Sequence, residues 1–356
     1  MRKPSHKEAV EETVKRIAEY LRVSSDEIKV EYPAASEPLK SRMDAIVEAG
    51  GFTFLIEYRS QGFAGIVSEA IEQLILHSRS LDEKGQITPL LVVPFMPDTG
   101  RSLCANSGVS WIDLSGNSNI MADGLIVHES GNPNRFVSRG RPENLFAPVS
   151  SRVARYILMH PRSSFSQREI SHSTGVDEGY VSKICSRLEE AKFIVRGDDR
   201  SIRVKDPDIL LDAWKDEYDP GDREWIRGHI PARSGTAAME TLVSFLDRES
   251  HGYALTGLAA AWLMTDFTSF RTVSIYLKNG IQLDTLEQIG FVRTEKGSNL
   301  AIVNGRCDEG VFQGLQKWGG VYCVHPIQAY LDLQGQPERS EEAAEELRKR
   351  LLKWEQ

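Results

Sequence analysis

The segment around Gly175 places the strongest restriction on what this chain can fold into. Ser166 and Glu169 are three residues apart, the spacing of a capping box at the start of a helix. Gly175 tolerates the positive φ that ends a helix sharply, and Asp177 is a suitable N-cap for the next helix. This order of cap, glycine and cap predicts two short helices joined by a tight turn.

The residues around the turn extend this pattern. Apolar residues stand where two crossing helices need packing, at Ile170, Val176, Val181 and Ile184. Residues 151–159 predict a preceding helix, and FIVRGDDRSIRV, residues 193–204, predicts a short hairpin after the pair. Together these elements predict a central winged helix-turn-helix domain, residues 149–215, and the length of 356 residues leaves room for a domain on each side.

The middle of the chain also differs in charge from the rest. Residues 151–205 contain 11 Lys and Arg against 7 Asp and Glu, a surplus of four, whereas the complete chain has a formal charge of −8. The net field therefore does not attract nucleic acid, and a DNA site has to come from this local basic patch.

The predicted winged helix supplies the candidate DNA-binding residues. They are Gln167, Arg168, Tyr180, Ser182, Lys183, Ser186, Arg187, Arg196, Arg200 and Arg203. We expect Tyr180, Ser182 and Lys183 to read bases in the major groove and the hairpin arginines to contact phosphates. The alternative is a protein-binding module whose arginines are only a solvated face, which the acidic hairpin tip, Asp198 and Asp199, favours.

The first region predicts a helix, a hairpin, a helix, a strand and a last pair of strands. Gly50-Gly51 is typical of a two-residue hairpin turn, and with this turn the numbers of opposed residues sum to 101. Asp44 then faces Glu57, and Arg42 faces Arg59. Two opposed carboxylates repel each other unless a cation, either a metal or an arginine, lies between them.

This order of elements, with Asp44 and Glu57-Tyr58-Arg59, resembles the restriction-endonuclease-like fold and its D…ExK signature. The resemblance implies carboxylates that hold a divalent metal and a lysine that helps to activate water. Arg59 replaces that lysine and cannot release a proton, and its fork could pair with both acids. Three hypotheses follow for residues 1–148: an inactive relative kept as a scaffold, which we favour, an active nuclease, and an unrelated α/β domain.

Other chemistry has little support in the sequence. The four cysteines, at 104, 185, 307 and 323, have no metal-binding or disulfide spacing, and no phosphate loop or hydrolase serine motif is present. We expect no metal and no cofactor. No apolar run approaches the roughly 20 residues that span a bilayer, and we expect a cytoplasmic protein without membrane contact.

The last region, residues 216–356, predicts a smaller α/β or α+β domain. Helices are expected at 236–250, 255–264 and 340–354, and strands at 272–277 and 300–304. The polar segment that ends near Gly235 predicts the boundary of this domain. The complete chain is therefore expected to be an α/β multidomain protein.

Several stretches together resemble the abortive-infection AbiEi family of type IV toxin-antitoxin systems. They are GVSWIDLSGNSNI at 108–120, the winged helix, GYALTGLAAAWLM at 252–264, and VHPIQAYLDLQGQPERSEEAAEELRKRL at 324–351. The resemblance implies a repressor that binds its own promoter and counters a nucleotidyltransferase-like toxin without obligatory contact. The nuclease-like domain in front departs from the simpler antitoxins, which begin with the winged helix, and an orphan regulator is equally compatible.

The leading expectation is a sequence-specific transcriptional regulator, not an enzyme, that binds double-stranded operator DNA as a homodimer, because one recognition helix reads few bases. The alternative is a metal-dependent DNA nuclease that uses the winged helix to find its substrate. A third hypothesis is a scaffold that binds protein partners through the acidic C-terminal domain.

Overall fold

The structure is a computed structural model that describes residues 4–32, 43–81, 86–137, 145–219, 223–305 and 309–354. The chain forms two compact units. One contains Met1–Asn144, Ser186–Val195 and Ile209–Asp216, and the other contains Leu145–Cys185, Arg196–Asp208 and Glu217–Gln356. The fold is mixed α/β, as expected, with a large mixed sheet in each unit. The boundaries of the three predicted domains stay a prediction.

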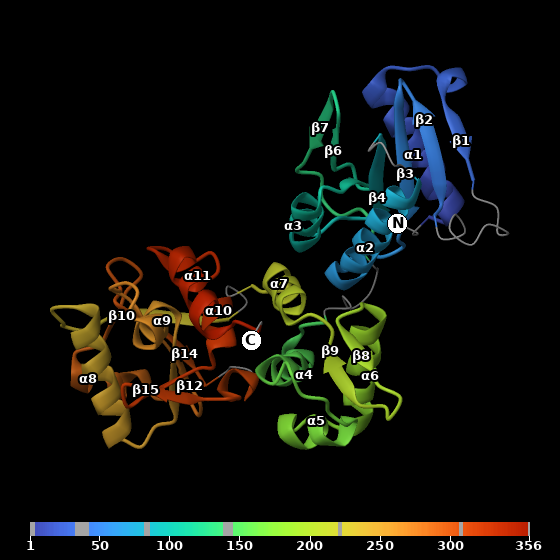
Figure 1. The fold of residues 1–356 in the computed structure, drawn as a ribbon. Coiled ribbons are helices and arrows are strands. Elements are labelled where there is room, and N and C mark those ends of the chain that lie inside the picture. Colours follow the sequence, from blue (N-terminus) through green and yellow to red (C-terminus); the bar gives the residue numbers. More distant parts are fainter. Residues whose placement is uncertain are drawn as a thin grey trace. The chain divides into compact units, whose positions relative to one another are not determined.

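A seven-stranded sheet forms the centre of the first unit, with its strands in chain order (Figure 1). The strands are β1 (Lys29–Glu31), β2 (Ala45–Ala49), β3 (Phe52–Tyr58), β4 (Ile87–Val93), β5 (Ser110–Asp113), β6 (Ser118–Ala122) and β7 (Leu125–Glu129). β3, β4 and β5 are parallel neighbours, and the other pairs are antiparallel.

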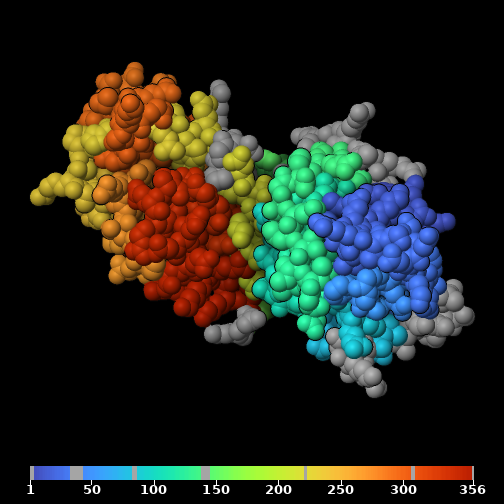
Figure 2. Space-filling model, turned by 90° about the horizontal axis from the view of Figure 1, so that it is seen from above, coloured from blue at the N-terminus to red at the C-terminus, as the bar shows by residue number. Residues whose placement is uncertain are grey.

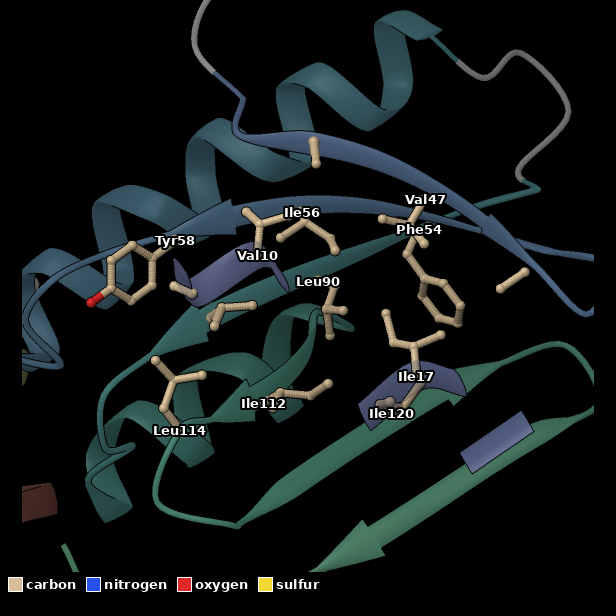
Figure 3. Packing of buried hydrophobic residues seen from close by; sticks show 14 residues of the cluster. Val10, Ile17, Val47, Phe54, Ile56, Tyr58, Leu90, Ile112, Leu114 and Ile120 are labelled. Carbon is tan, nitrogen blue, oxygen red and sulfur yellow. The ribbon is translucent and has the colours of Figure 1, made fainter. Parts of the chain in front are cut away.

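Helices cover both faces of this sheet because its central strands are apolar on both sides. Phe54, Ile56 and Leu90 pack with Val10 and Ile17 of α1 (His6–Leu21), as Figure 3 shows. The alternate strand residues, among them Leu55 and Leu91, pack with α2 (Ala64–Leu81) and α3 (Asp98–Ser107). Burial on both faces accounts for the continuous apolar run in β4.

The Gly50-Gly51 turn sets the register of the hairpin as predicted. Both glycines have positive φ, 56° and 84°, and Ala45 pairs with Ile56. The same register places Asp44 opposite Glu57. Arg42, which was expected opposite Arg59, lies outside the described residues. Helix α3 and strands β1 and β7 were not predicted.

The region predicted to be a winged helix contains three helices and a two-stranded sheet. They are α4 (Pro148–Met159), α5 (Gln167–Thr174), α6 (Glu178–Glu190), β8 (Ile194–Arg196) and β9 (Ile202–Val204). α4 begins three residues earlier than expected because Pro148 occupies its first turn, where a missing N–H has no cost. The division between the two units passes through α6 and β8, each of which is one continuous element. A further helix, α7 (Pro207–Glu217), follows.

The C-terminal part of the second unit contains the other mixed sheet, in the order β13-β10-β14-β12-β11-β16-β15. Its strands are β10 (Trp225–His229), β11 (Tyr253–Thr256), β12 (Val273–Leu277), β13 (Val292–Arg293), β14 (Leu300–Asn304), β15 (Gln316–Trp318) and β16 (Val321–Cys323). Its helices are α8 (Gly235–Arg248), α9 (Gly257–Thr265), α10 (Pro326–Asp332) and α11 (Ser340–Leu351), with short 3₁₀ helices η4 (Leu283–Ile289) and η5 (Glu309–Phe312).

One expectation for this region was wrong, and the domain boundary stays a prediction. The polar segment that ends near Gly235 contains β10, a strand that was not predicted and that pairs with β13 and β14 inside the sheet. The apolar run at 255–264 is not helical throughout, since Leu255 and Thr256 belong to β11. α9, α10 and α11 pack against one another, and the last two contribute the red surface in Figure 2. Among the described helices, none has the length and apolar character to cross a membrane.

Candidate nucleic-acid interface

The turn between α5 and α6 has the geometry that its sequence predicts. The Ser166 hydroxyl accepts the Glu169 N–H at 3.2 Å, and the Glu169 carboxylate accepts the Ser166 N–H at 2.7 Å. These hydrogen bonds lower the pKa of the Glu169 carboxyl. Gly175 ends α5 with φ 67°, and the Asp177 carboxylate accepts the N–H groups of Gly179 and Tyr180 at the start of α6.

Apolar packing then fixes how the two helices cross. The four expected residues, Ile170, Val176, Val181 and Ile184, are each at most 5% exposed. The Ser171 hydroxyl donates to the Val176 carbonyl at 2.7 Å, which ties the end of α5 to the turn. Because Gly175 ends α5, Asp177 caps the start of α6 and the inner face of α6 is buried, the outer face of α6 is held in one orientation.

The outer face of α6 carries an exposed stripe of Tyr180, Lys183 and Arg187. These residues are three and four positions apart, so they lie in a row along one side of the helix. Tyr180 is 40% exposed, and Lys183 and Arg187 make no ion pair with any residue in the described ranges. Ser182 and Ser186 lie beside this stripe and are half-buried. Tyr180, Lys183 and Arg187 are called the α6 stripe below.

The first turn of α5 adds Gln167 and Arg168. Gln167 is half-buried and Arg168 is exposed. Both follow the Ser166 cap directly, where the N-terminus of a helix favours negative charge. The sequence placed both residues at this terminus, and the structure agrees.

The hairpin β8–β9 lies where the sequence predicted the wing. Phe165 and Ile202 exchange two backbone hydrogen bonds of 2.8 and 2.7 Å, which join β9 to the residue just before the capping box. At the tip, the Arg200 N–H donates to the Gly197 carbonyl, and Arg200 has φ 63°. Arg200 and Arg203 are exposed, and Arg196 is half-buried.

An acidic pair interrupts the positive charge of the wing, as the sequence indicates. Asp198 and Asp199 are both exposed at the tip. Hydrogen bonds from Ser201 lower the pKa of the Asp199 carboxyl, so this residue is ionised at neutral pH. The wing therefore presents both signs of charge. The outer face of α6 presents cations and hydroxyl groups between Tyr180 and Arg187, with the exposed carboxylates of Glu178 and Glu190 at the two ends of the helix.

In the first unit, the two candidate carboxylates have separate partners. The Glu57 side chain is fully buried and forms an ion pair with Arg59, whose guanidinium also donates to Gln73 at 2.6 Å. Burial is the main cause that raises the pKa of Glu57 to about 7; Arg59 opposes this rise, and Asp44 and Glu69 add to it. The Arg59 guanidinium thus occupies the position beside the Glu57 carboxylate where a bound metal ion would have to lie.

Asp44 does not share Arg59, although the sequence left that pairing open. Its Oδ2 accepts the Tyr58 N–H at 2.7 Å, and its Oδ1 lies 2.6 Å from Nδ1 of His6 at the start of α1. His6 and Gln73 were missed because no local pattern connects them to the hairpin. In the described parts of the chain, no group of three or more His, Cys, Asp or Glu could hold a metal.

The motif at 108–120 has a structural role. Asp113 is fully buried, and its Oδ1 accepts the N–H groups of Ser115, Gly116 and Asn117 at 2.9 to 3.0 Å. Its Oδ2 accepts the Met96 N–H and the Asn117 amide at 3.2 and 2.8 Å. Five donors satisfy one carboxylate, which fixes the turn between β5 and β6.

A second buried carboxylate lies in the C-terminal part. Oδ1 of Asp332 accepts hydrogen bonds from Tyr218, Gln328 and Arg223, and Oδ2 accepts from Thr256 and Tyr276. Burial and the adjacent Asp332 charge raise the pKa of the Tyr276 hydroxyl. The Asp332-Leu333 step marked this place in the sequence, but four of the five partners of Asp332 are distant along the chain.

Comparison of the chain with models of protein families, with curated proteins and with solved structures found no match.

Proposed function

We propose that this protein is a sequence-specific DNA-binding transcriptional regulator that inserts α6 into the major groove. The α6 stripe carries this proposal. Lys183 and Arg187 are cations without a carboxylate partner among the described residues, and they stand on a helix whose orientation is fixed by two caps and a buried inner face. Unpaired cations beside hydroxyl groups are suited to phosphates and to the acceptors of guanine.

The remaining candidate residues fit the same role. Gln167 and Arg168 are placed to contact one DNA backbone at the N-terminus of α5, and Arg196, Arg200 and Arg203 to contact the other from the wing. Asp198 and Asp199 limit the contribution of the wing, because phosphates repel them. We therefore assign most of the affinity to α6 and α5.

We further propose that the regulator acts as an autorepressing antitoxin of the AbiEi type in the cytoplasm. It would bind its own promoter as a homodimer and counter a nucleotidyltransferase-like toxin without obligatory contact. Residues 1–148 would serve as a non-enzymatic scaffold. The pairing of Glu57 with Arg59 supports this role, since a guanidinium cannot accept a proton from water.

The test is binding of the purified chain to the DNA upstream of its own gene, against a scrambled fragment of equal length and composition. It is done at 50 and 200 mM salt, with and without Mg²⁺. Preferential and salt-dependent retention of the native fragment is expected, with a loss of about 10-fold or more between the two salts. Equal retention of both fragments would contradict sequence-specific binding, and cleavage with Mg²⁺ would contradict the non-enzymatic role.

A further inference from the structure

A hollow on the C-terminal sheet has the features of a ligand site. It has an empty volume of about 550 Å³, which includes its opening to solvent. One row of residues that pair directly across β10, β14, β12 and β11 contributes to its lining, namely Arg227, Ala301, Ser274 and Thr256. The small side chains of Ala301 and Ser274 lie in the middle of the row, and the long side chain of Arg227 lies at its end.

The walls of the hollow are partly apolar. Trp225 stands two residues before Arg227 on β10, so both side chains project from the same face of the sheet. Leu258, Leu333 and Pro337 contribute further apolar surface. An aromatic wall beside a few polar groups is the usual composition of a site for a small organic molecule.

The charged groups of the hollow differ in whether their hydrogen-bonding atoms are available to a ligand. Both carboxylate oxygens of Asp332 are used by the buried hydrogen bonds described above, and Arg223 lies 3.2 Å from Oδ1. Arg227 makes no side-chain hydrogen bond to a described residue, and its one described ion pair, to Glu295, spans 3.9 Å. The carboxylate of Glu338, which is exposed, lines the hollow as well.

The hydroxyl groups beside Arg227 are also available. Within the described ranges, neither Thr272 nor Ser274 makes a side-chain hydrogen bond, and both line the hollow. Thr256 donates to Asp332 and makes no side-chain cap bond to α9. The Thr272 and Ser274 hydroxyl groups can therefore donate to a ligand, and the one described ion pair of the Arg227 guanidinium is long.

We propose that this hollow binds a small organic anion that has a flat apolar part, such as an aromatic carboxylate. Arg227 pairs with the carboxylate, Thr272 and Ser274 donate hydrogen bonds to it, and Trp225 packs against the ring. The selectivity for an anion follows from Asp332, whose acceptors are filled, and from the guanidinium of Arg227, whose described ion pair with Glu295 spans 3.9 Å.

The same hollow is connected to the winged helix. Gln328, one helical turn before Asp332 on α10, donates to Asp332 at 2.7 Å and accepts from Arg155 of α4 at 2.5 Å. All three side chains are at most 4% exposed. A ligand that displaces Asp332 would, through Gln328, also displace Arg155 of α4. We therefore expect ligand binding to change the affinity for DNA. This consequence rests on the proposed function, whereas the ligand site itself does not.

The experiment uses the full chain and 4-fluorobenzoate as the probe, observed by ¹⁹F NMR. The matched controls are 4-fluorobenzyl alcohol, which is neutral, and 4-fluorobenzylamine, which is a cation. We expect line broadening with the carboxylate, with a dissociation constant on the order of 1 mM, and little with the amine. Absence of broadening up to about 10 mM, or equal broadening with all three probes, would overturn the proposal.

Two variants locate the site. Arg227→Gln removes the charge but keeps most of the side chain, and it should weaken binding of the carboxylate at least about fivefold. Arg293→Gln changes an exposed arginine of β13 outside the hollow and should leave binding unchanged. Unchanged binding in Arg227→Gln would overturn the assignment. Ser274→Leu, which fills the floor, is the second variant and should abolish binding if the chain folds.

The DNA arm separates this inference from the proposed function. With the upstream fragment, saturating 4-fluorobenzoate should change the DNA affinity about fivefold or more in the native chain and not in Arg227→Gln. Probe binding without DNA binding would overturn the proposed function and support the site. DNA binding without probe binding would overturn the ligand site and support the proposed function.

Discussion

Arg155 of α4 donates a hydrogen bond of 2.5 Å to Gln328 of α10, although 173 residues separate them in the sequence. Both side chains are buried, Arg155 at 2% and Gln328 at 0% exposure. Gln328 in turn donates to Asp332. A buried arginine is therefore linked to a buried aspartate through one amide. The first helix of the predicted winged helix, α4, is thereby held to the C-terminal part of its unit.

The first prediction concerns this amide. Gln328→Met keeps the length of the side chain but removes its three hydrogen bonds, so polar groups of Arg155, Asp332 and Tyr218 each lose a partner. Each such loss costs about 1 to 3 kcal/mol, and we expect the free energy of unfolding to fall by roughly 2 to 4 kcal/mol. Urea denaturation measures it. Gln282→Met, an exposed control, should stay within about 0.5 kcal/mol; an equally small effect at Gln328 would refute the linking role.

The second prediction concerns Asp113. In Asp113→Asn one acceptor oxygen becomes an NH₂ group that faces N–H donors, so at least one buried donor loses its partner. We expect a loss of about 2 to 4 kcal/mol in the free energy of unfolding. Asp123→Asn changes an exposed residue at the turn before β7 and should be nearly neutral. If the two variants are equally stable, the buried carboxylate does not fix this turn.

The third prediction concerns the pH dependence of Glu57. Its pKa is raised from 4.5 to about 7, so the folded state binds more protons than the unfolded state between these values. The contribution is therefore complete below about pH 4.5 and is lost as pH rises to 7, by up to about 3 kcal/mol at 1.4 kcal/mol per pKa unit. His6, Asp44, Glu69 and Arg59 are the charged or titratable groups nearby.

Glu57→Gln isolates this effect because it cannot titrate. Relative to the variant, the native chain should lose stability between pH 5 and 8, as measured by urea denaturation at each pH. A difference in stability that does not vary with pH would show that Glu57 keeps an ordinary pKa in the folded chain.

Local signals in the sequence predicted local structure well. The Gly50-Gly51 turn fixed the register that places Asp44 opposite Glu57, since a two-residue loop leaves only one alignment. Ser166, Gly175 and Asp177 likewise marked the ends of α5 and the start of α6. In each case the structure depends on a backbone conformation or a hydrogen bond between residues only a few positions apart in the sequence.

Contacts between distant segments could not be predicted in this way. Nothing near Gln328 indicates Arg155, and nothing near Asp44 indicates His6, because such pairs depend on how complete elements pack. β10 was missed for a related reason. Its flanks are rich in Pro, Gly and acidic residues, which is typical of a linker, and its strand structure comes from pairing with β14.

The fourth prediction concerns the cap of α5. Ser166→Ala removes the hydroxyl that accepts the Glu169 N–H, and loss of such a cap costs about 1 kcal/mol. The control is Ser164→Ala, because the Ser164 hydroxyl makes no hydrogen bond to any described residue. Hydrogen exchange of the α5 amides should become faster in Ser166→Ala only. Equal exchange in both variants would mean that the cap contributes little.

The most direct test of the central claim is the effect of Lys183→Ala on DNA binding, measured with the upstream and scrambled fragments over a range of salt concentrations. Lys296→Ala, an exposed lysine outside the winged helix, is the control. We expect Lys183→Ala to reduce the preference for the upstream fragment by about 1 to 3 kcal/mol, and Arg200→Ala to weaken binding to both fragments about equally. Native preference in Lys183→Ala, or the same loss on both fragments, would contradict base reading by α6.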